Sequence, residues 1–239
     1  MLTILFDGVA YGMLLFILAV GLAVTMGLMN FINLAHGAFA MAGGYITVLL
    51  MQRLDVPFLV CLPIAFVGTA LLGGVLERTL YRPLYHKAHL DQVLFSIGLV
   101  FMAVASVDYF VGSTQQIMQL PEWLKGRTEL GEGDWMLELG GGALTLGMGH
   151  YRLFIIAVCA ALTVGLQYVL TKTRFGSRLR ASVDDQRVAA GMGINVNIVF
   201  LSTFAFGSGL AGLGGALGAE VLGLDPSFPL KFMIYFLIV

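Results

Sequence analysis

The chain has 239 residues, of which 59% are hydrophobic and only 11% are charged, and its formal net charge is −1. Soluble domains carry roughly 25% charged residues, so this composition excludes an ordinary soluble domain and indicates a membrane protein. No basic tract indicates nucleic-acid binding. Cys61 and Cys159 both lie inside apolar runs and are interpreted as small buried hydrophobes, not as a disulfide or a metal site.

Apolar runs of about 20 residues, the length needed to cross a bilayer, recur along the chain. They predict one membrane domain over 1–239, an all-α polytopic transmembrane helical bundle, because helices satisfy their own backbone polar groups in lipid. The predicted spans are 9–28, 34–51, 57–76, 92–111, 152–171 and 198–219. A seventh run, Phe232–Val239, is too short to cross, so we expect the natural protein to continue beyond it.

The loops between the spans differ in charge. Basic residues gather in the loops 77–91 and 172–197, which are therefore expected in the cytoplasm. The region 112–150 has more acidic than basic residues and is expected outside, where residues 134–148 could form a small hairpin. Counting spans back from these loops places the N-terminus outside.

A polar junction separates the first two spans. Asn30, Asn33 and His36 are three residues apart and would share one face of a helix. Polar groups at membrane depth face a bundle interior or a water-filled path, so these residues and Gly37 are candidate translocation-path residues. The segment 29–44 either crosses or forms a broken or re-entrant segment. In the alternative interpretation, Asn33 caps the second span and His36 is hydrogen-bonded inside the bundle.

The charged segment 172–193 contains a candidate partner-binding helix. Ser182 followed by Asp185 fits a helix N-cap with an acidic first turn, and Gly193 offers a stop. The pattern predicts a short cytoplasmic helix at about 183–190, whose small residues leave a surface with little bulk for another protein. The alternative is an ordinary basic cytoplasmic loop. The residues assigned to partner coupling are Arg178, Asp184, Asp185, Arg187, Ala189, Ala190 and Gly193.

The last complete span carries small residues at every fourth position, Gly207, Ala211, Gly215 and Ala219. This spacing lets membrane helices approach closely. It indicates a helix at the bundle centre, packed within the chain or against a second subunit.

Enzymatic chemistry finds little support in the sequence. The chain has no Walker A sequence, and no His, Cys and carboxylate cluster has metal-ligand spacing. An intramembrane hydrolase would need Ser208 activated by His36, but Phe206 stands where a Gly-x-Ser-Gly pattern requires glycine.

Three stretches carry a family resemblance: GLMNFINLAHGAFAMAGG at 27–44, the segment 173–196, and FAFGSGLAGLGGALG at 204–218. The chain resembles the permease subunits of bacterial ABC importers for branched-chain amino acids, of the LivH type. The resemblance implies half of a translocation path in the bacterial inner (cytoplasmic) membrane, with no cofactor on this chain. It also implies a second related permease, two cytoplasmic ATPase subunits that hydrolyse ATP, and a periplasmic substrate-binding protein.

In that family a cytoplasmic loop docks into a groove of the ATPase, and the matching residues are Arg187 to Ala189 and Gly193. Arg187 stands where the family has an acidic residue, so the contact is expected to shift to Asp184 or Asp185. The family also contains importers of urea and short amides, from which no residue separates this chain. Related permeases also run further than this chain. Outside the family, the alternative is a stand-alone channel or secondary transporter for small polar solutes.

Overall fold

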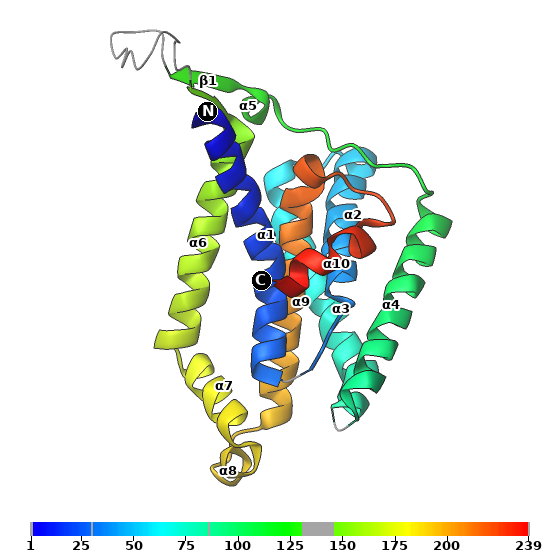
Figure 1. Ribbon diagram of the computed structural model, residues 1–239, viewed down its shortest axis with the longest axis vertical. Helices are drawn as coiled ribbons and strands as arrows, with labels where there is room; N and C mark the ends of the chain where they lie inside the picture. The colour runs from blue at the N-terminus through cyan, green and yellow to red at the C-terminus, as the bar shows by residue number, and fades with distance from the viewer. Residues whose placement is uncertain (1, 30, 86, 131–145, 239) are drawn as a thin grey trace.

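The computed structural model describes residues 2–29, 31–85, 87–130 and 146–238. The fold is the predicted all-α polytopic bundle, with one short hairpin of strands outside it (Figure 1). In chain order the elements are α1 (Leu2–Met29), α2 (His36–Leu54), α3 (Phe58–Leu76), the π-helix η1 (Glu77–Tyr81), the 3-10 helix η2 (Arg82–Leu84), α4 (His89–Phe110), α5 (Glu122–Lys125), β1 (Arg127–Leu130), β2 (Leu146–Gly149), α6 (His150–Lys172), α7 (Arg174–Asp184), α8 (Gln186–Gly191), α9 (Val196–Leu222) and α10 (Phe228–Ile238).

Within the described residues, five helices are long and apolar enough to cross a membrane, which makes the chain a multi-pass membrane protein. They cover Ile4–Gly27, Phe58–Leu84, His89–Phe110, His150–Lys172 and Val196–Leu222. Each overlaps a predicted span, but the helix predicted to end at residue 76 continues through η1 and η2 to Leu84, so the first part of the predicted loop 77–91 is helical. The remaining predicted span corresponds to α2, a helix of 19 residues that contacts α1, α3, α9 and α10.

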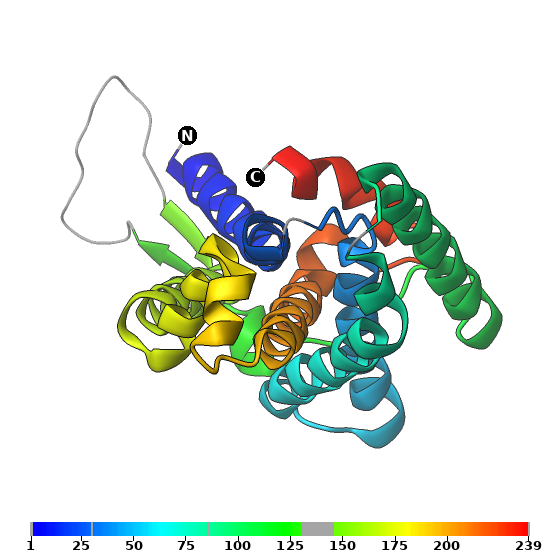
Figure 2. The same cartoon turned by 90° about the horizontal axis from the view of Figure 1, so that it is seen from below.

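Helix α9 lies at the centre of the bundle, in contact with α1, α2 and α3 (Figure 2). Its buried residues run from Val199 to Ala219, and many of them are glycine or alanine. Small side chains allow neighbouring backbones to approach closely, which strengthens van der Waals contact where lipid supplies no hydrophobic driving force. Helices α4 and α6 lie at opposite sides of this core, and each buries only three of its residues.

The chain is broken between α1 and α2. Residues 31–33 form no regular structure, residues 34–35 form a turn, and α2 begins at His36. Figure 1 shows the chain returning into the bundle along this segment. The break expected near 29–44 therefore occupies only its first part, because residues 36–44 are helical.

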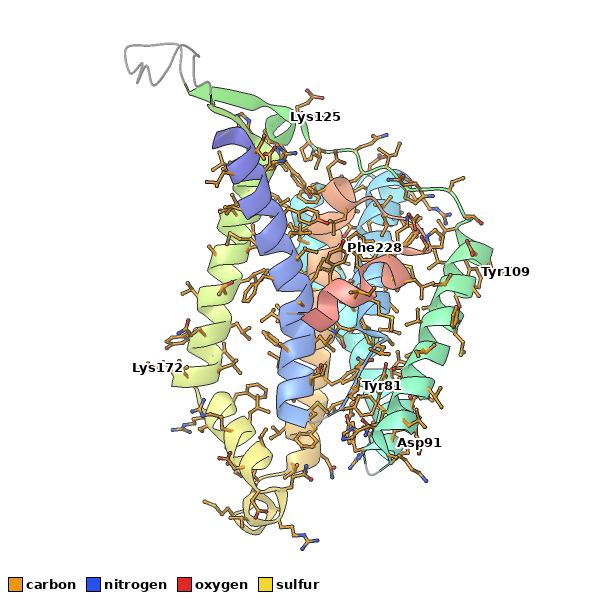
Figure 3. The ribbon with its side chains drawn as sticks, viewed as in Figure 1. Tyr81, Asp91, Tyr109, Lys125, Lys172 and Phe228 are labelled. Carbon is orange, nitrogen blue, oxygen red and sulfur yellow. The ribbon has the colours of Figure 1, made fainter. Side chains whose placement is uncertain are left out.

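The two basic loops lie at the same end of the bundle. Figures 1 and 3 place the connection before α4, near Asp91, at the end that also carries α7 and α8. Lys125 lies at the opposite end, where β1 and β2 pair antiparallel from Arg127↔Gly149 to Leu130↔Leu146. The hairpin predicted at 134–148 differs from the observed one, whose first strand lies before that range and whose second strand is at 146–149, while residues 131–145 lie outside the described residues.

After α9 the chain turns back, and α10 lies obliquely at mid-height against α2 (Figure 1). The seventh apolar run, predicted from Phe232, belongs to this helix, which begins at Phe228. The Asp225 carboxylate fixes the turn by accepting a hydrogen bond from Ser227 N at 2.8 Å and by pairing with Lys231. Burial would raise the pKa of Asp225, but the bonds from Lys231 and Ser227 outweigh it and lower the pKa.

Candidate translocation and coupling sites

Hydrogen bonds accepted by the buried Asn33 side chain hold the break between α1 and α2. Asn33 Oδ1 accepts one bond from Ala35 N at 3.1 Å and another from Tyr81 Oη at 3.0 Å. Ile32 N donates to Gln92 Oε1 at 3.4 Å. Asparagine competes with helical hydrogen bonding by binding nearby backbone groups, so Asn33 stabilises the non-helical segment before α2 and ties it to η1.

His36 begins α2 inside the bundle. Its Nε2 lies 2.9 Å from the Leu18 carbonyl oxygen of α1. Gly21 faces both this ring and Gly207 of α9, so closely that a β-carbon on Gly21 would overlap them. His36 therefore packs over the crossing of α1 and α9, where it satisfies its ring nitrogen with a backbone carbonyl as buried polar groups require.

The side chains proposed for the translocation path face protein in this single chain. Asn33 and His36 are each 1% exposed, and Gly37 is buried in the first turn of α2. His36 is hydrogen-bonded within the bundle, as the alternative interpretation expected. Asn33 accepts a hydrogen bond from Ala35 N but does not cap α2, because the N-cap residue of this helix is Ala35. Asn30 lies outside the described residues. The path assignment stays a prediction.

Sequence reasoning missed two residues that support the broken segment. Tyr81 is fully buried and packs its ring against Phe31, with the centroids 5.3 Å apart. Gln92 is 2% exposed and also donates through Nε2 to the Leu84 carbonyl oxygen at 3.3 Å. A glutamine among apolar residues at the start of a span was the available signal, because such a group needs internal partners.

The small residues of α9 contact different neighbours. Gly207 lies against Gly21 of α1, and Gly215 lies against the Ala40 backbone of α2. Ala211 and Ala219 are 0% and 3% exposed. All four therefore pack within this chain, at the crossings that bring α9 to the bundle centre.

Ser208 and His36, the two residues that an intramembrane hydrolase would require, do not form a nucleophile–base pair. Ser208 donates its hydroxyl hydrogen to the Phe204 carbonyl oxygen at 2.8 Å, one turn back on the same helix. His36 Nε2 lies at the Leu18 carbonyl. A nucleophile needs its base within hydrogen-bond reach, and each group is bound elsewhere.

The basic segment after α6 forms a helical hook. Helix α7 begins at a Thr173 cap whose Oγ1 accepts from Gly176 N at 3.3 Å. It turns Gly176, Leu179 and Ser182 inward and leaves Arg178 exposed. Ser182 is thus inside α7, where its Oγ donates to the Arg178 carbonyl oxygen at 2.8 Å, and the expected Ser182 cap is wrong.

Asp185 caps the second helix of the hook instead. Its Oδ1 accepts from Arg187 N at 2.8 Å and Val188 N at 3.0 Å. The predicted partner-facing helix accordingly runs over Gln186–Gly191, shorter than expected. An aspartate here also suits the positive end of the helix dipole.

Gly193 ends α8 in a Schellman motif. Gly193 N donates to the Ala190 carbonyl oxygen at 3.0 Å, and Ile194 N donates to the Ala189 carbonyl oxygen at 3.1 Å. Gly193 has φ of 82°, a left-handed conformation that glycine adopts at little cost. Glycine is needed here for its left-handed backbone conformation and not for lack of space, since nothing lies within 4 Å of the position of a β-carbon at Gly193.

The surface of α8 differs from the expected one. Ala189 is 1% exposed and faces inward, so the small-residue surface is reduced to Ala190 and Gly191. Two large apolar side chains outside the set assigned to partner coupling point outward, Val188 at 59% and Met192 at 75% exposure. Asp184, Asp185 and Arg187 are exposed as well. An exposed apolar pair with a charged rim is typical of a protein contact.

These features define a multi-pass membrane protein with a structured hook that projects from one end of its bundle (Figure 1). The sequence profile of a family described as branched-chain amino acid transport system / permease component matches residues 4–239. The chain belongs to this permease family.

Individual relatives agree with this membership. The high-affinity branched-chain amino acid transport system permease protein LivH of Escherichia coli (strain K12) is 27% identical over 229 residues, covering 92% of this chain and 71% of the relative. The corresponding BraD of Pseudomonas aeruginosa is 28% identical over 229 residues, covering 92% and 70%. A probable LivH of Methanocaldococcus jannaschii is 28% identical over 219 residues, covering 90% and 65%. No solved structure is a significant match.

Proposed function

We propose that this chain is the membrane-spanning permease subunit of an ATP-driven importer of branched-chain amino acids in the bacterial inner membrane. The relatives are named as branched-chain amino acid permeases, and a permease component implies further transport subunits. We propose as partners a second related permease, two cytoplasmic ATPase subunits and a periplasmic substrate-binding protein. ATP would bind to the ATPases and not to this chain.

The observation that carries this proposal is the hook formed by α7 and α8. It is held to the bundle by contacts of α7 with α6, α9 and α1, and it presents Val188 and Met192 at its tip. A hook packed in this way would transmit a push from a docked ATPase to α6 and α9. ATP drives a conformational change only if its binding favours one of two states, and the hook provides the contact through which that preference would act.

The substrate would be recognised mostly outside this chain. The buried polar groups near the break, Asn33 and His36, are an amide and an imidazole, and their partners are already present. A path lined by such groups would need to open between two permease subunits, and it would bind substrate weakly. Specificity for leucine, isoleucine or valine would then lie in the binding protein.

The direct test is uptake of labelled leucine into proteoliposomes that contain this chain with its partner subunits. We expect uptake only with ATP and binding protein, and competition by isoleucine and valine but not by urea. The double substitution Val188→Ser and Met192→Ser should weaken ATPase co-purification by about tenfold, because it removes two exposed apolar contacts.

The matched control for this substitution is Ile117→Ser, which changes a side chain that is 74% exposed in the connection between α4 and α5. Figure 1 shows this connection at the end of the bundle opposite α8. It should leave ATPase binding unchanged. Flux without ATP would contradict the importer and favour a channel. Competition by urea alone would contradict the amino-acid substrate, and unchanged ATPase binding in the double variant would contradict docking at the hook.

A further inference from the structure

An apolar cavity of about 240 Å³ lies where α1, α6, α7 and α9 meet. Its wall includes Val24, Leu166, Leu170, Phe175 and Phe206. The two hydroxyl side chains that also line it are turned to their own helix, since Ser202 Oγ donates to Ile198 O at 2.7 Å and Thr203 Oγ1 to Val199 O at 2.8 Å. The cavity is therefore lined almost entirely by hydrocarbon groups.

The cavity is part of the architecture of the hook. Helix α7 packs beneath the end of α6, with Gly176 so close to the Leu170 backbone that a β-carbon would overlap it. Arg180 donates to the Leu170 carbonyl oxygen. This packing directs Phe175 and Leu179 to the cavity wall. The cavity thus lies among the last turns of α6 and the first turns of α9, in the half of the membrane next to the basic end.

Two cationic side chains, Lys172 and Arg174, flank the junction between α6 and α7, called the elbow below. Lys172 ends α6 (Figure 3), and Arg174 begins α7 next to the cavity residue Phe175. Both are exposed. The ion pairs found among the described residues involve Lys125, Arg152 and Lys231. Within the part of the chain that the structure describes, no carboxylate therefore neutralises the elbow.

We propose that this site binds an anionic glycerophospholipid, with an acyl chain in the cavity and its phosphate on Lys172 and Arg174. A hydrocarbon cavity within the bilayer is filled by an acyl chain, and unpaired cations at the interface attract an anionic headgroup. The same lipid would touch α7 of the hook and the two helices α6 and α9, against which α7 packs. It would thereby hold the hook in place, independently of whether the transported solute is an amino acid.

The test is native mass spectrometry of the purified protein with phosphatidylglycerol and phosphatidylethanolamine of identical acyl chains. We expect phosphatidylglycerol to be retained at least fivefold more than phosphatidylethanolamine. The double substitution Lys172→Gln and Arg174→Gln should remove this preference, since each interfacial cation contributes to anionic lipid binding. Ser202→Phe, or Ser202→Leu if the larger side chain prevents folding, should fill the cavity and lower the retention of both lipids.

The matched control is Arg78→Gln, which removes an exposed cation from η1, the element whose Tyr81 lies toward the same end of the bundle in Figure 3. It should leave the lipid preference unchanged. Equal retention of both lipids by the unmodified protein would overturn the proposal, as would a preference that survives the double substitution. Cross-linking of Ser202→Cys to another protein subunit instead of lipid would also overturn it. Since lipid binding is measured without transport, these outcomes do not depend on the importer assignment.

Discussion

Gly215 of α9 lies directly against the Ala40 backbone of α2, so closely that a β-carbon on Gly215 would overlap the Ala40 carbonyl oxygen. Because the atom in the way belongs to backbone, no rotamer change relieves the overlap. The crossing of α2 and α9 at this point therefore depends on the absence of a single methyl group.

We expect Gly215→Ala to destabilise the protein by about 1–3 kcal/mol, as overpacking in a close-packed interior does, and Gly215→Leu to prevent assembly of the bundle. The measurement is the thermal unfolding midpoint in detergent. Gly165→Ala is the control, because nothing lies within 4 Å of a β-carbon at Gly165. An unchanged midpoint for Gly215→Ala would show that α9 does not approach α2 as described.

Gly193 is expected to couple the hook to transport through its backbone conformation. At φ of 82° an alanine is strained by about 1 kcal/mol, so Gly193→Ala should lower the leucine uptake obtained per ATP hydrolysed without changing binding-protein affinity. Gly193→Asn should retain more coupling, because asparagine tolerates the left-handed region. Equal coupling ratios in the two variants and the unmodified protein would argue against this role.

The N-cap of α8 is Asp185 in the structure, whereas the sequence predicted Ser182 as the cap. Asp185→Ala should remove about 1 kcal/mol from the stability of α8, and hydrogen exchange of the Arg187 and Val188 amides should accelerate about fivefold. Asp185→Asn should retain protection because its side-chain oxygen still accepts hydrogen bonds. Ser182→Ala should leave these amides unaffected. Protection lost in Ser182→Ala alone would restore the original assignment of the cap.

The bond from Tyr81 to Asn33 should stabilise the break between α1 and α2. Tyr81→Phe removes one buried hydrogen bond and should cost about 1 kcal/mol, measured as a lower thermal midpoint. Tyr109→Phe is the control, since Tyr109 is 84% exposed. If both variants unfold at the same temperature, the bond contributes nothing to stability.

Local patterns in the sequence were sufficient for the helical bundle. Long apolar runs require helices in lipid, so five of the predicted spans coincide with long apolar helices in the structure. The Gly-rich α9 was also recognisable, because small residues at intervals of four form a continuous face on any helix. The family resemblance rested on the same local stretches and is confirmed by the profile match over residues 4–239.

Only the tertiary structure decided which neighbours these faces meet. Asn33 was a candidate cap of α2, and it binds Tyr81 and Ala35 instead because of where η1 lies in space. Ser182 and Asp185 are both good capping residues. Because α7 extends through Ser182, Asp185 is the residue that caps α8. The sequence by itself determined the periodicity of apolar and small residues, whereas contacts between residues far apart in the chain determined which polar groups are buried and which side chains remain for a partner.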